Sequence, residues 1–249
     1  MNKRPDINDI INFIPIFPGE IVVARKEAMN IFNTKIDDMA LGIVAGLPKF
    51  SKQEKLEHYC KKLQKVITVA HTKGGVGKST LAWNLAHSLR VHGEEVKIID
   101  LDFQQTLCFI NAIADMNNEE TIEVLQPQSG SELIEIIEEY HGYLIIDVGG
   151  FDNDINRIAL SRADKILVPI SPSITEVIGF KTFEAIIEDI NATSINMVLN
   201  NIHPLQKDFT EIEKVVNNSG AKLLKTIIRS RKTYKDVLAL GKSVFTYTD

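Results

Sequence analysis

The stretch Lys73-Gly-Gly-Val-Gly-Lys-Ser-Thr80 decides the fold, because it lies between an apolar run at 66–70 and a helical pattern that begins at Leu81. A strand, a glycine-rich turn and a helix start, in this order, direct backbone N–H groups and a helix N-terminus at a phosphate. Glycines have no Cβ, so the backbone curls closely around phosphate oxygens. The sequence therefore predicts a loop that binds a nucleoside triphosphate.

This loop departs from the usual pattern of Gly, four residues and Gly-Lys-Ser/Thr, because Thr72 stands at the first glycine position and Lys73 follows it. Lys78 is predicted to reach the terminal phosphates, and the Ser79 hydroxyl to ligate Mg²⁺. The local pattern assigns no role to Lys73 beyond extra positive charge. The other residues predicted to surround the nucleotide are Gly74, Gly75, Val76, Gly77 and Thr80.

The composition is that of a globular protein: 249 residues, 44% hydrophobic and 24% charged, with a net charge of −5. Cys60 and Cys108 form neither a metal-binding spacing nor a disulfide framework, which indicates a reducing compartment. The N-terminus does not resemble a signal peptide, and no run reaches the roughly 20 apolar residues of a membrane span. We therefore expect a cytoplasmic protein without stable membrane association.

Residues 1–65 differ from the rest of the chain. Three short helices are predicted here, at about 20–32, 35–45 and 52–65. The region holds 11 Lys or Arg against 8 Asp or Glu. It is expected to be a small helical N-terminal extension that packs on the main domain or mediates assembly. A helix-turn-helix module that reads DNA is the less favoured alternative, because no base-reading cluster is recognisable.

From residue 66 to 249 the pattern alternates between strand and helix. Short apolar runs typical of strands buried on both faces are followed by amphipathic helices, for example at 131–140 and 175–191. This alternation predicts an α/β domain with a doubly wound, mostly parallel sheet that binds ligands at the carboxyl ends of its strands. Strands are predicted at 66–70, 96–100, 121–125, 143–148, 165–170, 195–200 and 224–228.

Acidic residues end two of these strands. Asp100 and Asp102 follow the run at 96–100, and Asp147 with Gly149 and Gly150 follows the next buried run. Parallel strands bring these tips to the edge that carries the glycine-rich loop, where carboxylates hold Mg²⁺ or orient the attacking water. We assign metal-side roles to Asp147 and Asp100, and the water-orienting role to Asp102.

The loop, Asp100-Leu-Asp-Phe-Gln-Gln105, Ile145-Ile-Asp-Val-Gly-Gly150 and Ala163-Asp-Lys-Ile-Leu-Val-Pro-Ile-Ser-Pro-Ser173 together resemble the deviant Walker-A ATPases. Within that group the chain is similar to the ParA partition ATPases, and its segment 226–244 resembles their C-terminal end. The resemblance covers residues 66 to about 245. One departure is Phe103, since the family usually has Asp-Pro-Gln here, and it leaves the turn after Asp102 open.

The resemblance implies a Mg²⁺-dependent ATPase whose ATP-bound sandwich dimer binds DNA non-specifically. In this dimer Lys73 reaches across to the partner's nucleotide, so Lys73, Lys78, Asp102 and Asp147 form the implied catalytic set. Hydrolysis, stimulated by a ParB-like centromere-binding activator, resets the dimer. The implied location is the nucleoid, and the implied role is partition of a plasmid or chromosome.

The C-terminal segment offers a site for DNA. Residues 222–242 contain seven Lys or Arg and one acid, Asp236, in a protein of net charge −5. Such a segment contacts phosphates with salt-dependent affinity, or is a solvated surface. Asn200, beside Asn201 at a late strand tip, is assigned by position to the adenine base. The residues predicted to contact DNA are Lys225, Arg229, Arg231, Lys232 and Lys235.

Two other classes of function stay open. A regulator resembling MinD acts on a membrane or a protein cargo, but it needs an amphipathic terminal helix, whereas this chain ends Val244-Phe-Thr-Tyr-Thr-Asp249. A P-loop enzyme acting on small molecules or electron carriers needs cluster-binding cysteines or a substrate pocket that the sequence does not reveal.

Overall fold

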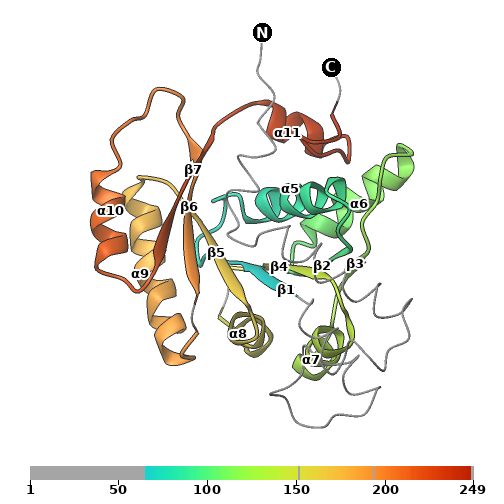
Figure 1. Ribbon diagram of the computed structural model, residues 1–249, viewed down its shortest axis with the longest axis horizontal. Coiled ribbons are helices and arrows are strands. Elements are labelled where there is room, and N and C mark those ends of the chain that lie inside the picture. The colour runs from blue at the N-terminus through green and yellow to red at the C-terminus, as the bar shows by residue number, and fades with distance from the viewer. Residues whose placement is uncertain (1–64, 151, 193, 248–249) are drawn as a thin grey trace, which may run out of the picture. The chain divides into compact units, whose positions relative to one another are not determined.

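The computed structural model describes residues 65–150, 152–192 and 194–247. The predicted N-terminal extension, apart from Lys65, lies outside these residues, so its helices and its role stay predictions. Strands and helices alternate along the described chain (Figure 1). The elements are β1 (Lys65–Val69), α5 (Lys78–Val91), β2 (Val96–Leu101), α6 (Thr106–Met116), β3 (Val124–Leu125), α7 (Gly130–Glu139), β4 (Tyr143–Val148), α8 (Asp154–Ser161), β5 (Lys165–Ile170), α9 (Ile174–Asp189), β6 (Ile195–Ile202), α10 (Thr210–Asn217), β7 (Lys222–Arg229) and α11 (Thr233–Leu238).

The strands form one seven-stranded sheet in the order β3-β2-β4-β1-β5-β6-β7. Every pairing is parallel, which confirms the predicted fold class. Each predicted strand is present, but β3 is shorter than predicted, since only Val124 and Leu125 pair with β2. The N–H of Ile122 instead donates to the Asn111 side chain of α6. Only the last two residues of the predicted strand therefore pair with the sheet.

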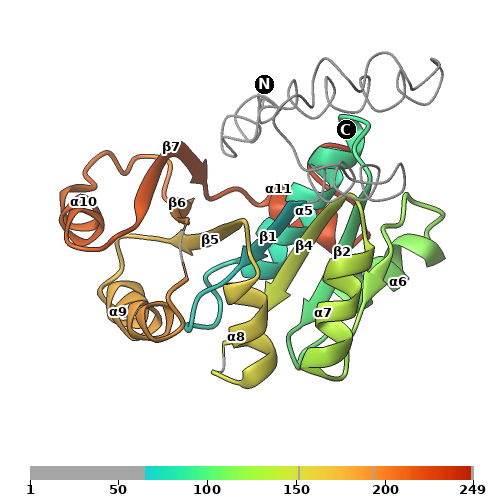
Figure 2. The ribbon, with the colours of Figure 1, turned by 60° about the horizontal axis from the view of Figure 1, so that its bottom comes forward.

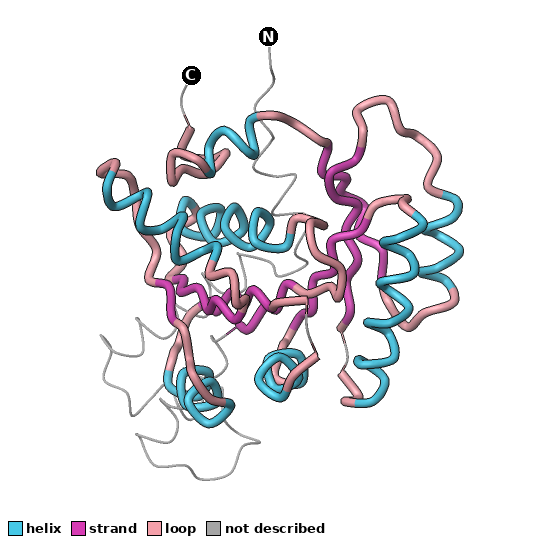
Figure 3. The backbone as a smooth tube through the Cα atoms, turned by 180° about the vertical axis from the view of Figure 1, so that it is seen from behind, coloured by secondary structure: helices cyan, strands magenta, loops and turns pink. Residues whose placement is uncertain are grey.

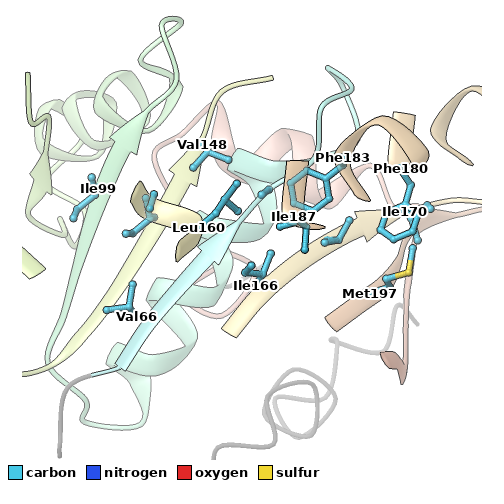
Figure 4. Packing of buried hydrophobic residues seen from close by; sticks show 14 of the residues in the cluster. Val66, Ile99, Val148, Leu160, Ile166, Ile170, Phe180, Phe183, Ile187 and Met197 are labelled. Atoms are coloured by element: carbon cyan, nitrogen blue, oxygen red, sulfur yellow. The ribbon is translucent and has the colours of Figure 1, made fainter. Parts of the chain in front are cut away.

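Helices cover both faces of this sheet, with α5, α6 and α11 on one face and α7 to α10 on the other (Figures 1 and 3). Strand β4 is therefore buried at all six positions. Burying each large apolar side chain stabilises the fold by about 1.5–3 kcal/mol. Figure 4 shows part of the main hydrophobic cluster, which includes Val66, Ile99, Val148, Leu160, Ile166, Ile170, Phe180, Phe183, Ile187 and Met197.

The winding reverses between β1 and β4, which are neighbours in the sheet (Figure 2). The chain leaves β1 for α5 on one face, and leaves β4 for α8 on the other. In a doubly wound sheet, ligands bind at the carboxyl ends of the strands at such a switch point. The glycine-rich loop follows β1 directly, so the fold places it at this point.

The segment that follows α11 packs on α5 and α6. Trp83 Nε1 donates to the Lys242 carbonyl at 3.1 Å, and the Asn84 side chain accepts the Val244 N–H at 2.9 Å. Gly241 lies against α6 so closely that a Cβ there would be 2.3 Å from the backbone nitrogen of Ala114. These contacts hold the segment that follows α11 on the first face of the sheet. Within the described ranges, no helix is long and apolar enough to cross a bilayer.

Candidate nucleotide site

The glycine-rich loop closes over the first turn of α5. Gly75 and Gly77 have φ angles of 77° and 92°, a left-handed conformation that residues with a Cβ rarely adopt. A Cβ on Gly77 would also lie 2.5 Å from Nδ2 of Asn200. The N–H groups of the first turn of α5 have no acceptor within the helix, and the helix dipole favours an anion there. This arrangement suits a phosphate.

Two side chains brace the loop. Lys78 is only 6% exposed, and its Nζ lies 3.4 Å from the carbonyl oxygen of Lys73, so the ammonium is turned back into the loop. Asn200, near the carboxyl end of β6, donates from Nδ2 to the Val76 carbonyl at 2.8 Å. Asn200 thus supports the loop backbone, and its contact with adenine stays a prediction.

Lys73 points away from the loop to the start of α9. Its Nζ donates to Thr175 Oγ1 at 2.6 Å and lies 3.9 Å from a carboxylate oxygen of Glu176. The neighbouring Thr72 hydroxyl donates to the Gly179 carbonyl at 2.7 Å, which ties the same two segments together. The Lys73 side chain is 34% exposed. Its charge is therefore held at the surface beside the loop.

Asp147 ends β4 at 0% exposure, and neither carboxylate oxygen accepts a hydrogen bond of good geometry from a described residue. Burial raises its pKa to about 7; the Ser79 hydroxyl and Lys78 oppose this shift, whereas Asp100 and Asp102 reinforce it. A buried carboxyl with unmet oxygens beside a hydroxyl fits a divalent cation, which would stabilise the charged form. The pair formed by Ser79 and Asp147 therefore fits the predicted Mg²⁺.

The described residues contain no cluster of three or more His, Cys, Asp or Glu side chains that could hold a metal by itself. Mg²⁺ keeps several waters and binds one or two protein ligands together with the phosphates of a substrate. Such an ion would depend on the nucleotide for part of its coordination.

Asp100 caps α6 rather than projecting freely from the sheet. Its Oδ2 accepts the N–H groups of Leu107 and Cys108 at 2.9 and 3.3 Å, and Oδ1 accepts the N–H of Asp102 at 3.1 Å. Burial raises the pKa of Asp100, while these three backbone bonds favour the charged form. Asp102 is partly exposed and accepts the N–H of Gln104 at 2.9 Å. The metal-side role of Asp100 stays a prediction, but its carboxylate has a structural role in the turn.

The turn after Asp102 forms without a proline. Phe103 is 88% exposed, and Gln105 takes a left-handed φ of 51° directly before α6. The capping by Asp100 thus maintains the turn without the proline usual in the family.

The glycine pair after β4 brings three loops together. A Cβ on Gly150 would lie 2.8 Å from the Thr72 carbonyl, and one on Gly149 would lie 3.6 Å from Cα of Asp102. The loop after β4 therefore passes between those after β1 and β2. Both predicted acidic tips lie at the edge that carries the phosphate loop, as the parallel arrangement predicts.

A cavity of about 160 Å³ extends from Gly75–Gly77 along the start of α5 to the end of β7 and α11. Asn200 and Asn201 line it, as do Arg231 and Lys235, two of the residues predicted to contact DNA. Arg229 also lines it, but its guanidinium donates to the carbonyls of His203 and Gln206 at 3.1 and 2.7 Å. The side chains predicted to contact DNA therefore differ in their contacts: Arg229 is held by backbone carbonyls, whereas Arg231 and Lys235 line the cavity.

The remaining two do not line the cavity. Lys225 is exposed on β7, which is an edge strand of the sheet. Lys232 is exposed and lies 3.7 Å from Asp236. Charged side chains on an edge strand also discourage pairing with other strands, so Lys225 has a structural explanation besides DNA.

Comparison with protein families agrees with this geometry. The model described as "CbiA: CobQ/CobB/MinD/ParA nucleotide binding domain" matches residues 67–244. The chain belongs to this family. Its deviant Walker-A loop and fold are those that the sequence resemblance predicted, so that prediction is confirmed.

The chain is similar to partition and septum-site proteins over most of its length. Protein ParA of Rhizobium radiobacter is 25% identical over an alignment of 186 residues that covers 71% of this chain and 83% of that protein. A putative plasmid partition protein from Borrelia burgdorferi, solved with AMPPNP, matches with a TM-score of 0.54 at 18% identity over 72% of this chain and 90% of that one. The septum site-determining protein MinD from Pyrococcus horikoshii, solved with Mg-ADP, gives 0.56 at 14% identity, with coverages of 74% and 89%.

Sequence reasoning missed the residues that seat Lys73 in this family member. His71 is buried, accepts the Lys73 N–H on Nδ1 at 3.0 Å, and stacks on Phe183. Burial, with Lys78 and Lys73 nearby, lowers the pKa of His71 to about 4, so the ring is neutral at pH 7 and accepts this bond. The spacing of Ser173 and Glu176 is a helix-start signal that was available in the sequence. The contact of Thr175 and Glu176 with Lys73, about 100 residues earlier in the chain, could not be read from the sequence.

Proposed function

We propose that the protein is a Mg²⁺-dependent ATPase that hydrolyses ATP to ADP and phosphate and acts as a nucleotide-controlled homodimer. The dimer binds DNA non-specifically on the nucleoid and partitions or positions a cargo. Family membership supports nucleotide binding. The observation that carries the dimer is Lys73, whose ammonium lies outside its own loop, against Thr175 and Glu176, and partly exposed.

The chain's own groups support hydrolysis in three ways. The loop and Lys78 bind and orient the phosphates. Ser79 and Asp147 hold Mg²⁺, which supplies charge neutralisation at the phosphates when it is bound. Asp102, partly exposed at the same edge, orients the attacking water. Lys73 from a second copy adds positive charge, so the site is complete only after association.

A positively charged surface supports the DNA-binding part of the proposal. Lys222 and Lys225 are exposed on β7, and Lys232 lies on the following turn. Binding through phosphates gives low sequence specificity and strong salt dependence. Because dissociation follows hydrolysis, a ParB-like activator that accelerates hydrolysis resets the dimer. Protein ParA and the putative plasmid partition protein are the relatives that favour this role over others.

Lys73→Ala tests the dimer. We expect the variant to bind ATP within about twofold of wild type, because Lys78 still holds the phosphates, but to remain monomeric with ATP and Mg²⁺ in light scattering. Lys181→Ala is the matched control, since Lys181 is an exposed lysine on α9 that pairs with Glu184. A Lys73→Ala protein that still dimerises would contradict the role across the interface.

Duplex binding by the wild-type protein tests the cargo class. With ATP and Mg²⁺ we expect non-specific duplex to bind at low salt and to be released as salt rises. The alternative is a MinD-like regulator of a membrane or protein cargo, which the fold shared with MinD keeps open. Co-sedimentation with anionic liposomes and no DNA binding would establish that alternative instead.

A further inference from the structure

Two buried histidines lie on either side of the phosphate loop in the chain, and they differ in their hydrogen bonds. His71 precedes the loop and His87 lies on α5; each is 1% exposed and lies against an aromatic ring. Burial lowers the pKa of both to about 4, so both rings are neutral at pH 7. Among the described residues, neither ring nitrogen of His87 has a hydrogen-bond partner, whereas Nδ1 of His71 accepts the Lys73 N–H at 3.0 Å. Of the two rings, that of His71 is bonded to the loop backbone.

Helix α9 holds the ring of His71 in place. The ring stacks on Phe183 with an angle of 8° between the two planes, and Phe183 belongs to the main hydrophobic cluster (Figure 4). A Cβ on Gly179 would lie 3.0 Å from Cε1 of His71, so α9 leaves the ring little room on that side. Side chains packed in this way stay in one orientation. The acceptor nitrogen of His71 therefore points at a fixed place.

The bond to His71 removes the Lys73 N–H from the donors that the loop offers to a phosphate. The N–H groups of such a loop serve an anion when they point into it. This one is instead bonded to a side chain two residues earlier. A local bond of this kind restricts the backbone at Lys73, and with it the direction of the side chain. That side chain leaves the loop and reaches Thr175 and Glu176.

We propose that His71 is a positioning residue for Lys73: its Nδ1 fixes the Lys73 backbone so that the ammonium projects from the loop towards a second copy of the chain. This inference rests on the proposed homodimer. Thr175 and Glu176 hold the tip of Lys73 at a partly exposed position, where such contacts contribute little. The tip is therefore free to exchange them for the partner's nucleotide. Because the His71 ring is buried, its bond to the backbone remains when the tip moves.

Two substitutions separate the acceptor nitrogen from the ring that carries it. His71→Phe keeps an aromatic ring against Phe183 but removes Nδ1. His71→Asn loses the ring but supplies an amide oxygen that accepts the N–H two residues later, as in an Asx-turn. His87→Phe is the matched control, because it replaces an equally buried ring whose nitrogens bond to no described residue. All three substitutions are made in the full chain.

Hydrogen exchange and dimerisation are the two measurements. In nucleotide-free protein we expect the Lys73 N–H to exchange roughly tenfold faster in His71→Phe, because it has lost its acceptor, and as in wild type in His71→Asn. With ATP and Mg²⁺, the dissociation constant of the dimer should rise roughly tenfold in His71→Phe. It should stay within about threefold of wild type in His71→Asn and His87→Phe. Rescue by asparagine would assign the effect to the acceptor.

Three results would overturn the proposal. Folded His71→Phe protein with the exchange or the dimer affinity of wild type would show that the bond has no effect on Lys73. A loss in His71→Asn equal to that in His71→Phe would assign the effect to ring packing. An equal loss in His87→Phe would assign it to the replacement of any buried histidine near the loop.

Thermal unfolding identifies a His71→Phe protein that does not fold, and His71→Asn then decides. Exchange of its Lys73 N–H at the rate of wild type supports the proposal, and exchange roughly tenfold faster overturns it. Failure of the proposed function is distinguishable from failure of this inference. Variants that differ in exchange as expected, from a wild-type protein that forms no dimer with ATP, would contradict the homodimer and not the contact between His71 and Lys73.

Discussion

Asp147 is fully buried, and its carboxylate oxygens have no good hydrogen-bond partner among the described residues. Its ordinary pKa is 3.8, and burial raises the pKa to about 7 in the folded protein. Between these values the folded state keeps a proton that the unfolded chain has released. The contribution of Asp147 to stability is therefore present below about pH 4 and is lost as the pH rises to about 7. At neutral pH the nucleotide-free protein is thus destabilised at its predicted metal site.

Asp147→Asn removes this destabilisation. We expect the variant, free of nucleotide and metal, to be more stable than wild type at pH 7 by on the order of 2 kcal/mol, with the difference vanishing near pH 4. Urea unfolding at several pH values measures this, and Mg²⁺-dependent hydrolysis should be lost. Asp152→Asn, at a surface ion pair with Arg157, is the control and should change stability little. A destabilised Asp147→Asn protein would show that the carboxylate has a stabilising partner.

Helix α5 shows how one element combines two functions. Its N-terminus begins directly at the phosphate loop, while its buried face supports the C-terminal segment. Glycines with left-handed φ lie just outside both ends: Gly77 at 92° and Gly93 at 81°. A Cβ on Gly93 would meet no described atom within 4 Å, whereas Gly77 is packed against Asn200. The two positions share a left-handed backbone conformation and differ in packing.

Alanine at each position separates these effects. Gly93→Ala should cost about 1 kcal/mol of stability through backbone strain and leave ATP affinity unchanged. Gly77→Ala should in addition push Asn200 from the Val76 carbonyl and weaken ATP binding roughly tenfold or more. Thermal unfolding and calorimetric titration of both variants measure the two quantities. Equal ATP affinities would mean that the contact between Asn200 and the loop has no effect on the site.

Contacts between residues distant in sequence join helix α5, which follows the phosphate loop, to the C-terminal segment after α11. Asn84 donates to the Thr80 carbonyl and accepts the Val244 N–H from 160 residues away. Asn117 makes a similar long-range contact, donating to the Leu240 carbonyl, but at an exposed position. The buried contact is expected to matter more, because its loss leaves a backbone N–H without water or a partner.

Asn84→Ala should therefore destabilise the protein by about 1–3 kcal/mol and expose the C-terminal segment to proteolysis. Asn117→Ala, its exposed counterpart, should cost less than about 0.5 kcal/mol. Urea unfolding and limited trypsin digestion provide the comparison. If the two variants were equally destabilised, the buried location of the Asn84 bond would not be the source of its strength.

Local patterns were sufficient for much of the fold and for the position of the glycine-rich loop. Neighbouring residues set the order of strand, Gly-Gly-Val-Gly-Lys-Ser loop and helix. The buried runs are long enough to identify every strand, although β3 starts later than predicted. Asp147 was placed beside the loop because parallel strands end at one edge. These predictions succeeded because their causes, backbone freedom at glycine and two-sided burial, act within a few residues.

Only the tertiary structure showed what those residues contact. It turned Asp100 towards the start of α6, placed Lys73 against α9 and Asn200 against Val76, and set part of the basic C-terminal segment along the cavity. Each of these depends on which side chains meet after the strands are ordered. The sequence by itself therefore determined the α/β class and the nucleotide loop, whereas packing between distant segments decided the surroundings of each charged group.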